Sequence, residues 1–180
     1  MGKNKVRVAT MWFSGCAGCH MSLLDIDEAI IDLAQRIELC NSPLTDLKVF
    51  PEDPVDVTLI EGAVANEEHL ALVKEARAKS KILVALGDCA VTGNVPALRN
   101  GLQPDKMIEE IYGRSRTSNG ALPYEVVPHL LDRVRPLHEV VPVDFFLHGC
   151  PPPAGVIAKV VLALVDGKTP ELVGEELKFG

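Results

Sequence analysis

The chain has 180 residues, of which 47% are hydrophobic and 24% charged, a composition typical of a globular domain with its own core. Its formal net charge is −7, and the Lys and Arg residues are scattered, which argues against nucleic acid as a partner. No apolar run approaches the ~18 residues of a membrane span, and we expect no secretion signal at the N-terminus. We therefore expect a cytoplasmic protein, whose five cysteines are metal ligands or free thiols.

Strand and helix patterns alternate along the chain. Strands are predicted at residues 6–13, 55–62, 81–87 and 143–149. Helices are predicted at residues 21–37, 66–80 and 154–167. In the first helix the spacing places Leu24, Ile31 and Ala34 on one apolar side, and Asn66 is the expected N-cap of the second. This alternation predicts an α/β fold, in which a parallel sheet has helices on both faces.

Two segments interrupt the regular pattern. Residues 41–54 form an irregular connection, and residues 98–142 are rich in Gly, Pro, Asn and Arg, with short helical candidates at 106–113 and 128–136. We interpret residues 1–180 as a single domain in which residues 98–142 are an irregular insertion.

Cysteines follow three of the four predicted strands. Cys16 and Cys19 follow the first strand, Cys89 follows the third, and Cys150 follows the fourth in the stiff segment "HGCPPP". Glu61 has the matching place after the second strand. The carboxyl ends of parallel strands meet at one edge of a sheet, where ligands bind, so these residues are expected to converge there.

Four thiolates can hold either an iron–sulfur cluster or zinc. Structural zinc sites usually have two short cysteine pairs, whereas this chain has one C-x-x-C pair and two distant single cysteines, Cys89 and Cys150. The spacing therefore favours a cluster, with zinc and redox thiols as the alternatives. The fifth cysteine, Cys40, is interpreted as a small buried apolar residue.

The motifs "CAGCHMSLLD", "IEGAV", "GDCAVTGNVPALRN" and "VPVDFFLHGCPPP" together resemble the small, electron-transferring subunit of [NiFe] hydrogenases. The resemblance is strongest to the short cytoplasmic forms of NAD-reducing hydrogenases. It extends to the subunit of respiratory complex I that carries the terminal cluster. It implies a flavodoxin-like, three-layer α/β/α domain. By position, the ligands of one [4Fe–4S] cluster would be Cys16, Cys19, Cys89 and Cys150.

The same resemblance implies a heteromeric oxidoreductase in which this chain is not catalytic alone. A large subunit would carry the nickel–iron site that cleaves hydrogen. Diaphorase subunits with FMN and iron–sulfur clusters would reduce NAD⁺ with the electrons. The alternatives are a hydrogenase that uses F420, ferredoxin or a heterodisulfide reductase, and a quinone-reducing complex I-type subunit. The C-x-x-C motif disfavours the last, because complex I relatives have two adjacent cysteines there.

Four further expectations concern the surroundings of the thiols. Glu61 either caps a turn or pairs with an arginine, or else it borders the cluster and tunes its potential or carries protons. His20 and His148 are expected to be hydrogen-bond donors beside the ligands or exposed residues, and Asp88 is expected to cap its loop. FMN bound by this chain is a weaker alternative, because no phosphate-binding loop is evident.

Overall fold

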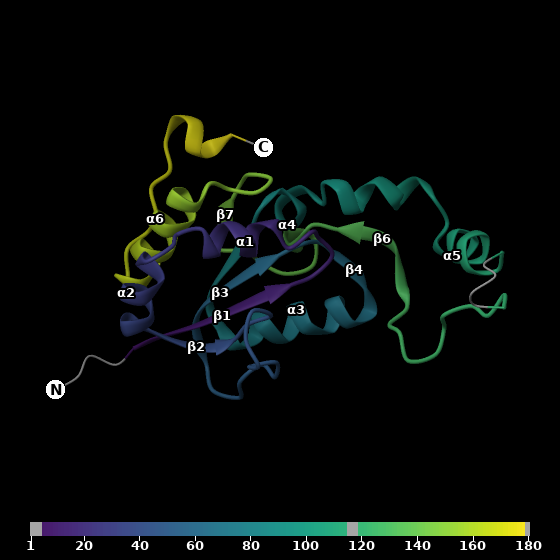
Figure 1. Cartoon of the computed structure of the whole chain (residues 1–180), viewed down its shortest axis with the longest axis horizontal. Helices are drawn as coiled ribbons and strands as arrows, with labels where there is room; N and C mark the ends of the chain where they lie inside the picture. Colours follow the sequence, from purple (N-terminus) through teal and green to yellow (C-terminus); the bar gives the residue numbers. More distant parts are fainter. Residues whose placement is uncertain (1–4, 115–118, 179–180) are drawn as a thin grey trace.

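The computed structural model describes residues 5–114 and 119–178. Within these ranges, five strands form one parallel sheet in the order β2-β1-β3-β5-β7, which is the flavodoxin-like order (Figure 1). The strands of the sheet are β1 (Val6–Trp12), β2 (Ile37–Asn41), β3 (Val55–Glu61), β5 (Ser80–Leu86) and β7 (Phe145–Leu147). The predicted α/β class and parallel sheet are therefore confirmed.

Helices cover both faces of the sheet. The helices are α1 (Gly18–Leu24), α2 (Ala29–Arg36), α3 (Glu67–Lys79), α4 (Asp88–Thr92), α5 (Pro104–Tyr112) and α6 (Ala154–Val165). On β5, Leu83 and Ala85 pack in the core that contains α3 and α4, whereas Val84 and Leu86 pack in the core that contains α1, α2 and α6. Alternation along the strands thus builds two cores and three layers (Figure 1).

The predicted helix at residues 21–37 is wrong as a single element. It is divided into α1 and α2, and residues 37–41 form the edge strand β2 instead. The interruption includes Asp27, whose φ of 54° lies in the left-handed region that aspartate tolerates better than most residues. The expected apolar side is also wrong, because Leu24 and Ile31 are exposed and Leu33 is the buried residue of α2.

Residues 128–136, predicted as helical, contain a strand instead. Strands β4 (Val64–Asn66) and β6 (Leu130–Arg135) form a separate antiparallel pair beside the main sheet. The side chain of Asn100, at the end of the 3₁₀-helix η1 (Val95–Gly101), bonds to both the N–H and the C=O of Val134. Backbone groups of β6 are therefore satisfied by neighbours distant in sequence, which a local helical pattern does not reveal.

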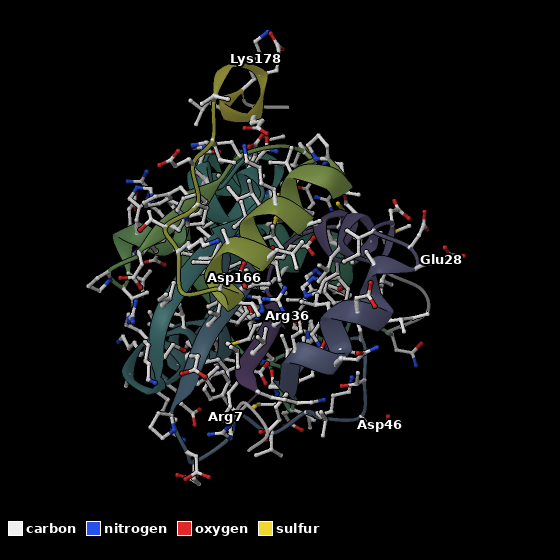
Figure 2. All side chains as sticks on the ribbon, turned by 90° about the vertical axis from the view of Figure 1, so that its left-hand side faces the viewer. Arg7, Glu28, Arg36, Asp46, Asp166 and Lys178 are labelled. Carbon is white, nitrogen blue, oxygen red and sulfur yellow. The ribbon has the colours of Figure 1, made fainter. Side chains whose placement is uncertain are left out.

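The C-terminal ends of α2 and α6 meet on one face of the sheet. Arg36 and Asp166 point toward one another and form an ion pair in this region (Figure 2). Both side chains are about 40% exposed, so the pair contributes little stability. Burial of Leu33 and Ile157 in the shared core is the larger contribution to the packing of these helices. The short 3₁₀-helix η2 (Leu137–Glu139) contributes Leu137 to the core that contains α3 and α4, and a further 3₁₀-helix, η3 (Gly174–Leu177), follows α6 in the chain.

The N-cap of α3 gives a testable prediction about the fold. The Oδ1 atom of Asn66 accepts a hydrogen bond from the N–H of His69 at 2.8 Å, as the sequence predicted. We expect Asn66→Ala to lower the free energy of unfolding by about 1 kcal/mol, measured by urea denaturation, because this N–H loses its partner. Asn66→Asp keeps the acceptor and should unfold like the wild type, and equal losses in both variants would contradict the capping role.

Candidate metal centre

One register of the parallel sheet aligns the ends of four strands. Trp12 pairs with Glu61, Glu61 with Leu86, and Leu86 with Leu147. Three of these four strands, β1, β5 and β7, are each followed by a cysteine three or four residues later. Hydrogen bonding between parallel strands therefore sets the cysteine-bearing loops close together at the carboxyl edge of the sheet.

The loops after β1 and β3 are fastened to each other by their backbones. The N–H of Ser14 donates to the C=O of Ala63, and the N–H of Ala63 donates to the C=O of Ser14, at 3.1 and 2.8 Å. The turn requires glycine at position 62, where φ is +89° and a Cβ atom would lie 2.7 Å from the carbonyl carbon of Phe13. This pairing fixes the start of the loop that carries Cys16.

The loops that carry Cys89 and Cys150 are joined by a reciprocal pair of hydrogen bonds. The N–H of Gly149 donates to Asp88 Oδ1 at 2.7 Å, and the N–H of Asp88 donates to the C=O of Gly149 at 2.9 Å. Asp88 is only 4% exposed, so these bonds are protected from water. Asp88 thus links two loops, a role that the sequence did not predict.

Helix α1 is tied to the last of these loops. The Ser22 hydroxyl donates to the C=O of Pro152 at 2.6 Å, a contact for which the sequence offers no local signal. Gly87, after β5, faces Cys19 so closely that a Cβ atom at position 87 would lie 2.2 Å from Cys19 Sγ. The C-x-x-C segment is therefore packed directly against the loops that carry the other two cysteines.

The structure brings Cys16, Cys19, Cys89 and Cys150 into one neighbourhood. Burial strongly raises the pKa of the Cys19 thiol, and the nearby Glu61 carboxylate and the other three thiols raise it further. Burial also raises the pKa of Cys89, with Cys150 and Cys16 among the further causes. Their role as ligands stays a prediction.

The fifth cysteine lies elsewhere. Cys40 belongs to the edge strand β2, beside the middle of β1, and its Sγ is 3.3 Å from the C=O of Glu38. Its half-buried position differs from the fully buried one that was expected.

The donor set fits a cationic centre. A buried thiol resists ionisation next to other acidic groups unless a positive charge compensates, and iron ions supply such charge to their thiolate ligands. Cys16 and Cys150 are exposed, Cys89 is half-buried and Cys19 is buried, so the set lies partly at the surface. Across residues 5–114 and 119–178, no three Cys, His, Asp or Glu side chains are placed to hold a single metal ion, whereas the four thiolates of a [4Fe–4S] cluster each bind a different iron.

The buried residues Glu61 and His20 form a pair beside these thiols. The Glu61 carboxylate is 2.5 Å from His20 Nδ1 and also accepts the N–H groups of His20 and Cys19. The alternative that Glu61 pairs with an arginine is not what the structure shows.

The sequence analysis also did not predict a contact between Asn94 and the thiol of Cys150. The side-chain nitrogen Nδ2 of Asn94 lies 3.5 Å from Cys150 Sγ.

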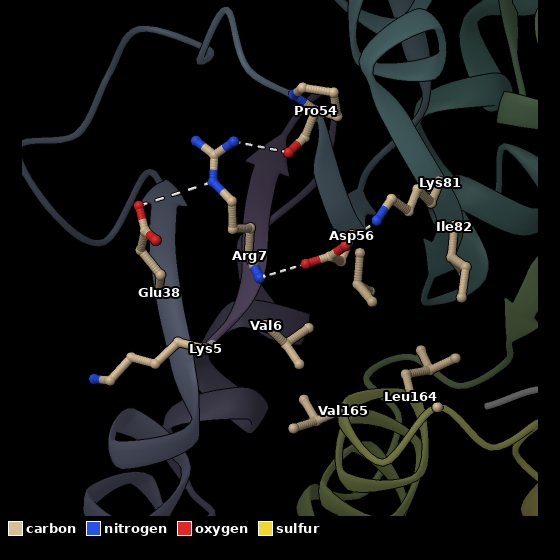
Figure 3. A pocket seen from close by; sticks show the side chains of 12 residues that line it. Lys5, Val6, Arg7, Glu38, Pro54, Asp56, Lys81, Ile82, Leu164 and Val165 are labelled. Carbon is tan, nitrogen blue, oxygen red and sulfur yellow. Dashed lines mark hydrogen bonds and ion pairs between the residues drawn. The ribbon is translucent and has the colours of Figure 1, made fainter. Parts of the chain in front are cut away.

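A cavity of about 720 Å³ lies at the opposite edge of the sheet, where the strands begin (Figure 3). Its charged side chains are largely paired with one another or with the backbone. Lys81 Nζ lies 2.7 Å from Asp56 Oδ1, and an Nη atom of Arg7 donates to the C=O of Pro54 at 2.8 Å. The cavity is remote from Cys16, Cys19, Cys89 and Cys150, which lie at the other edge of the sheet.

Together, the sheet order and the thiols at its carboxyl edge define the class of small, α/β hydrogenase subunits. The chain superimposes on a chain of a solved NAD⁺-reducing [NiFe]-hydrogenase in its H₂-reduced state. The TM-score is 0.92 at 37% sequence identity, covering 98% of this chain and 100% of that one. A recombinant [NiFeSe] hydrogenase from Desulfovibrio vulgaris Hildenborough shares the fold, with a TM-score of 0.61 at 17% identity over 91% of this chain and 60% of the other.

Residues 16–164 match the model of the NADH ubiquinone oxidoreductase 20 kDa subunit family, and the chain belongs to that family. It is 42% identical to a subunit of the F420-non-reducing hydrogenase of Methanothermobacter marburgensis, over 96% of this chain and 58% of that protein. It is 37% identical to the delta subunit of the NAD-reducing hydrogenase HoxS of Cupriavidus necator, over 92% and 81%.

These findings confirm the resemblance that the four motifs carry. The chain spans less than three fifths of the length of the Methanothermobacter relative. Within its described residues, the chain has no helix with the length and apolar character needed to cross a bilayer.

The close approach of Gly87 to Cys19 predicts that no side chain is tolerated there. Gly87 has φ 80° and ψ 163°, a backbone conformation that is essentially confined to glycine. We expect Gly87→Ala to lower the free energy of unfolding by at least about 1–3 kcal/mol, because strain and the clash with Cys19 Sγ combine. Gly155→Ala, in open space on α6, is the matched control. Equal unfolding midpoints for the two variants in urea would refute this account.

Proposed function

We propose that this chain is the electron-relay subunit of a cytoplasmic, NAD-reducing [NiFe] hydrogenase, and that it holds one [4Fe–4S] cluster through Cys16, Cys19, Cys89 and Cys150. A bound cluster of this kind accepts and passes on single electrons. The large subunit would cleave hydrogen, and diaphorase subunits would reduce NAD⁺. The observation that carries the proposal is the convergence of thiols from three strand ends at one sheet edge, in a chain that matches a hydrogenase subunit over 98% of its length.

The chain's own contribution is to hold the ligands rigidly. The bonds between Asp88 and Gly149 keep the Cys89 and Cys150 loops at a fixed separation, and Ser22 ties α1 to the second of them. Preorganised loops bind a group without losing further conformational entropy. The side chain of Asn94 can donate toward Cys150 Sγ, and hydrogen bonds to cluster sulfurs raise the reduction potential relative to an unbonded thiolate.

The same edge has the character of an interface. Cys16 and Cys150 are exposed there, and the apolar side chains of Trp12 and Met21 are 49% and 63% exposed on β1 and α1. A cluster open to water and oxygen would need cover, and exposed apolar groups beside it suit a large protein surface. The large hydrogenase subunit is the partner that fits this position.

A second candidate differs only in the electron acceptor. The identity to the F420-non-reducing hydrogenase subunit of Methanothermobacter marburgensis, at 42%, exceeds that to the NAD-reducing subunit of Cupriavidus necator, at 37%. A hydrogenase with another acceptor, such as ferredoxin or a heterodisulfide reductase, is therefore the alternative. The acceptor binds other subunits, so assays of the complex with each acceptor decide between the two.

The ligand assignment predicts the metal content. Anaerobically purified protein should contain about four irons and four sulfides per chain. Replacing Cys16, Cys19, Cys89 or Cys150 by Ala removes one ligand, so each variant should lose the cluster or contain it in an altered form. Iron and sulfide analysis and EPR would measure this change. Cys40→Ala is the matched control and should retain the wild-type content, because Cys40 lies on β2 away from the other thiols. Zinc without sulfide in the wild type would disprove the assignment.

The partner assignment predicts the composition of the native complex. Affinity purification of the tagged chain from its own cells should recover a larger, nickel-containing chain and hydrogen-dependent reduction of NAD⁺. Met21→Asp places a charge on the exposed face of α1 and should reduce recovery of that chain at least ten-fold, since charges are depleted from interface cores. Ile31→Asp, on the exposed side of α2, is the control. A stable, active monomer would contradict the proposal.

A further inference from the structure

Two buried polar side chains from distant elements meet beside Cys19. Glu61 ends β3 and His20 lies in α1, and their exposed fractions are 2% and 1%. His20 Nδ1 and Glu61 Oε2 are 2.5 Å apart, a short contact in which the imidazole N–H donates to the carboxylate. Such a pair in the interior orders both side chains, because each has few other positions in which its polar atoms are satisfied.

Glu61 acts on the backbone of the C-x-x-C segment. Its Oε1 accepts the N–H of Cys19 at 3.3 Å, and its Oε2 accepts the N–H of His20 at 2.9 Å. Helix α1 has Ala17 at its N-cap, which offers no side-chain acceptor for these N–H groups. The carboxylate from β3 therefore replaces the missing cap and fixes the first turn of the helix against the sheet.

His20 is the side chain that holds Glu61 in this position. In the described part of the chain, the ion-pair partner recorded for Glu61 is His20, and no lysine or arginine pairs with it. Without the imidazole, the carboxylate would keep only the two backbone donors and would be free to turn away from one of them. Packing alone does not account for the imidazole, because its Nε2 is buried without a hydrogen-bond partner among the described residues. Leucine would fill similar space without that unsatisfied atom.

We propose that His20 is a positioning residue for the metal centre, which acts through Glu61 to fix the backbone of Cys19 and hence the C-x-x-C ligands. The inference rests on the proposed function, because it assigns His20 to the retention of the cluster that those ligands hold. Glu61 and His20 set the start of α1, whereas Ser22 ties the same helix to Pro152 on the opposite side. The helix is thereby held both at the end of β3 and at the loop that carries Cys150.

Two substitutions at position 20 separate hydrogen bonding from packing. His20→Leu fills the space but removes the donor, whereas His20→Asn offers an amide N–H near the place of Nδ1. In the native complex, we expect His20→Leu to lose iron to a chelator at least five-fold faster than the wild type, with an altered EPR spectrum of the reduced cluster. His20→Asn should recover most of the wild-type rate and spectrum. Thr58→Val is the control: Thr58 lies on the same strand as Glu61, and its loss removes a buried hydrogen bond to Ser80 on β5. This variant should change neither the rate of iron loss nor the EPR spectrum.

A second measurement does not depend on the cluster. Backbone hydrogen exchange of a peptide spanning residues 16–22 should be at least ten-fold faster in His20→Leu than in the wild type, and near wild type in His20→Asn. Equal exchange and chelator rates in all three proteins would overturn the positioning role, as would Asn behaving like Leu. A different outcome is that the purified wild type contains no iron, while hydrogen exchange still differs among the wild type, His20→Leu and His20→Asn as expected. That result would overturn the proposed function and leave the positioning of Cys19 standing.

Discussion

The parallel register through Trp12, Glu61, Leu86 and Leu147 is the constraint on which the candidate site depends. A shift of one residue in a single strand would turn its side chains to the other face and displace the following loop by about 3.3 Å. The two cores resist such a shift, because successive buried residues of β5 belong alternately to one core and the other. Packing of the ordinary apolar core, to which Cys19 itself belongs, therefore specifies the separation of the thiols at the carboxyl edge.

Beyond the strand ends, polar contacts replace apolar packing as the source of precision. The loops meet through backbone pairs at Ser14 and Ala63 and through the side chains of Asp88 and Ser22. These groups are largely buried, so each lost partner would leave a desolvated donor or acceptor. The glycines at positions 62 and 87 provide the space that makes these close contacts feasible.

The sequence predicted the elements whose signals are local. Strands β1, β3 and β5, the capped helix α3 and the closing helix α6 follow their hydrophobic patterns, and so does the position of each cysteine after a strand. Strand β2 was missed because "IELC" continues the helical pattern of α2 without a glycine or proline to mark the change. Strand β6 was missed because its partners, on η1 and β4, are more than 30 residues away in sequence. The Glu61–His20 contact was hidden for the same reason, since 41 residues separate the two.

Electrostatics at the carboxyl edge also bear on which group can bind there. Burial is the largest cause of the raised pKa of Cys89, and the other thiols and the carboxylates of Glu61 and Asp88 raise it further. A flavin phosphate placed among them would meet the same repulsion, whereas flavodoxin-like sheets that bind FMN offer hydrogen-bond donors at this edge. Here the N–H groups of Cys19, His20 and Gly149 already donate to Glu61 and Asp88. These backbone donors order the loops, and the negative charge at the edge suits a cationic iron centre better than an anionic cofactor.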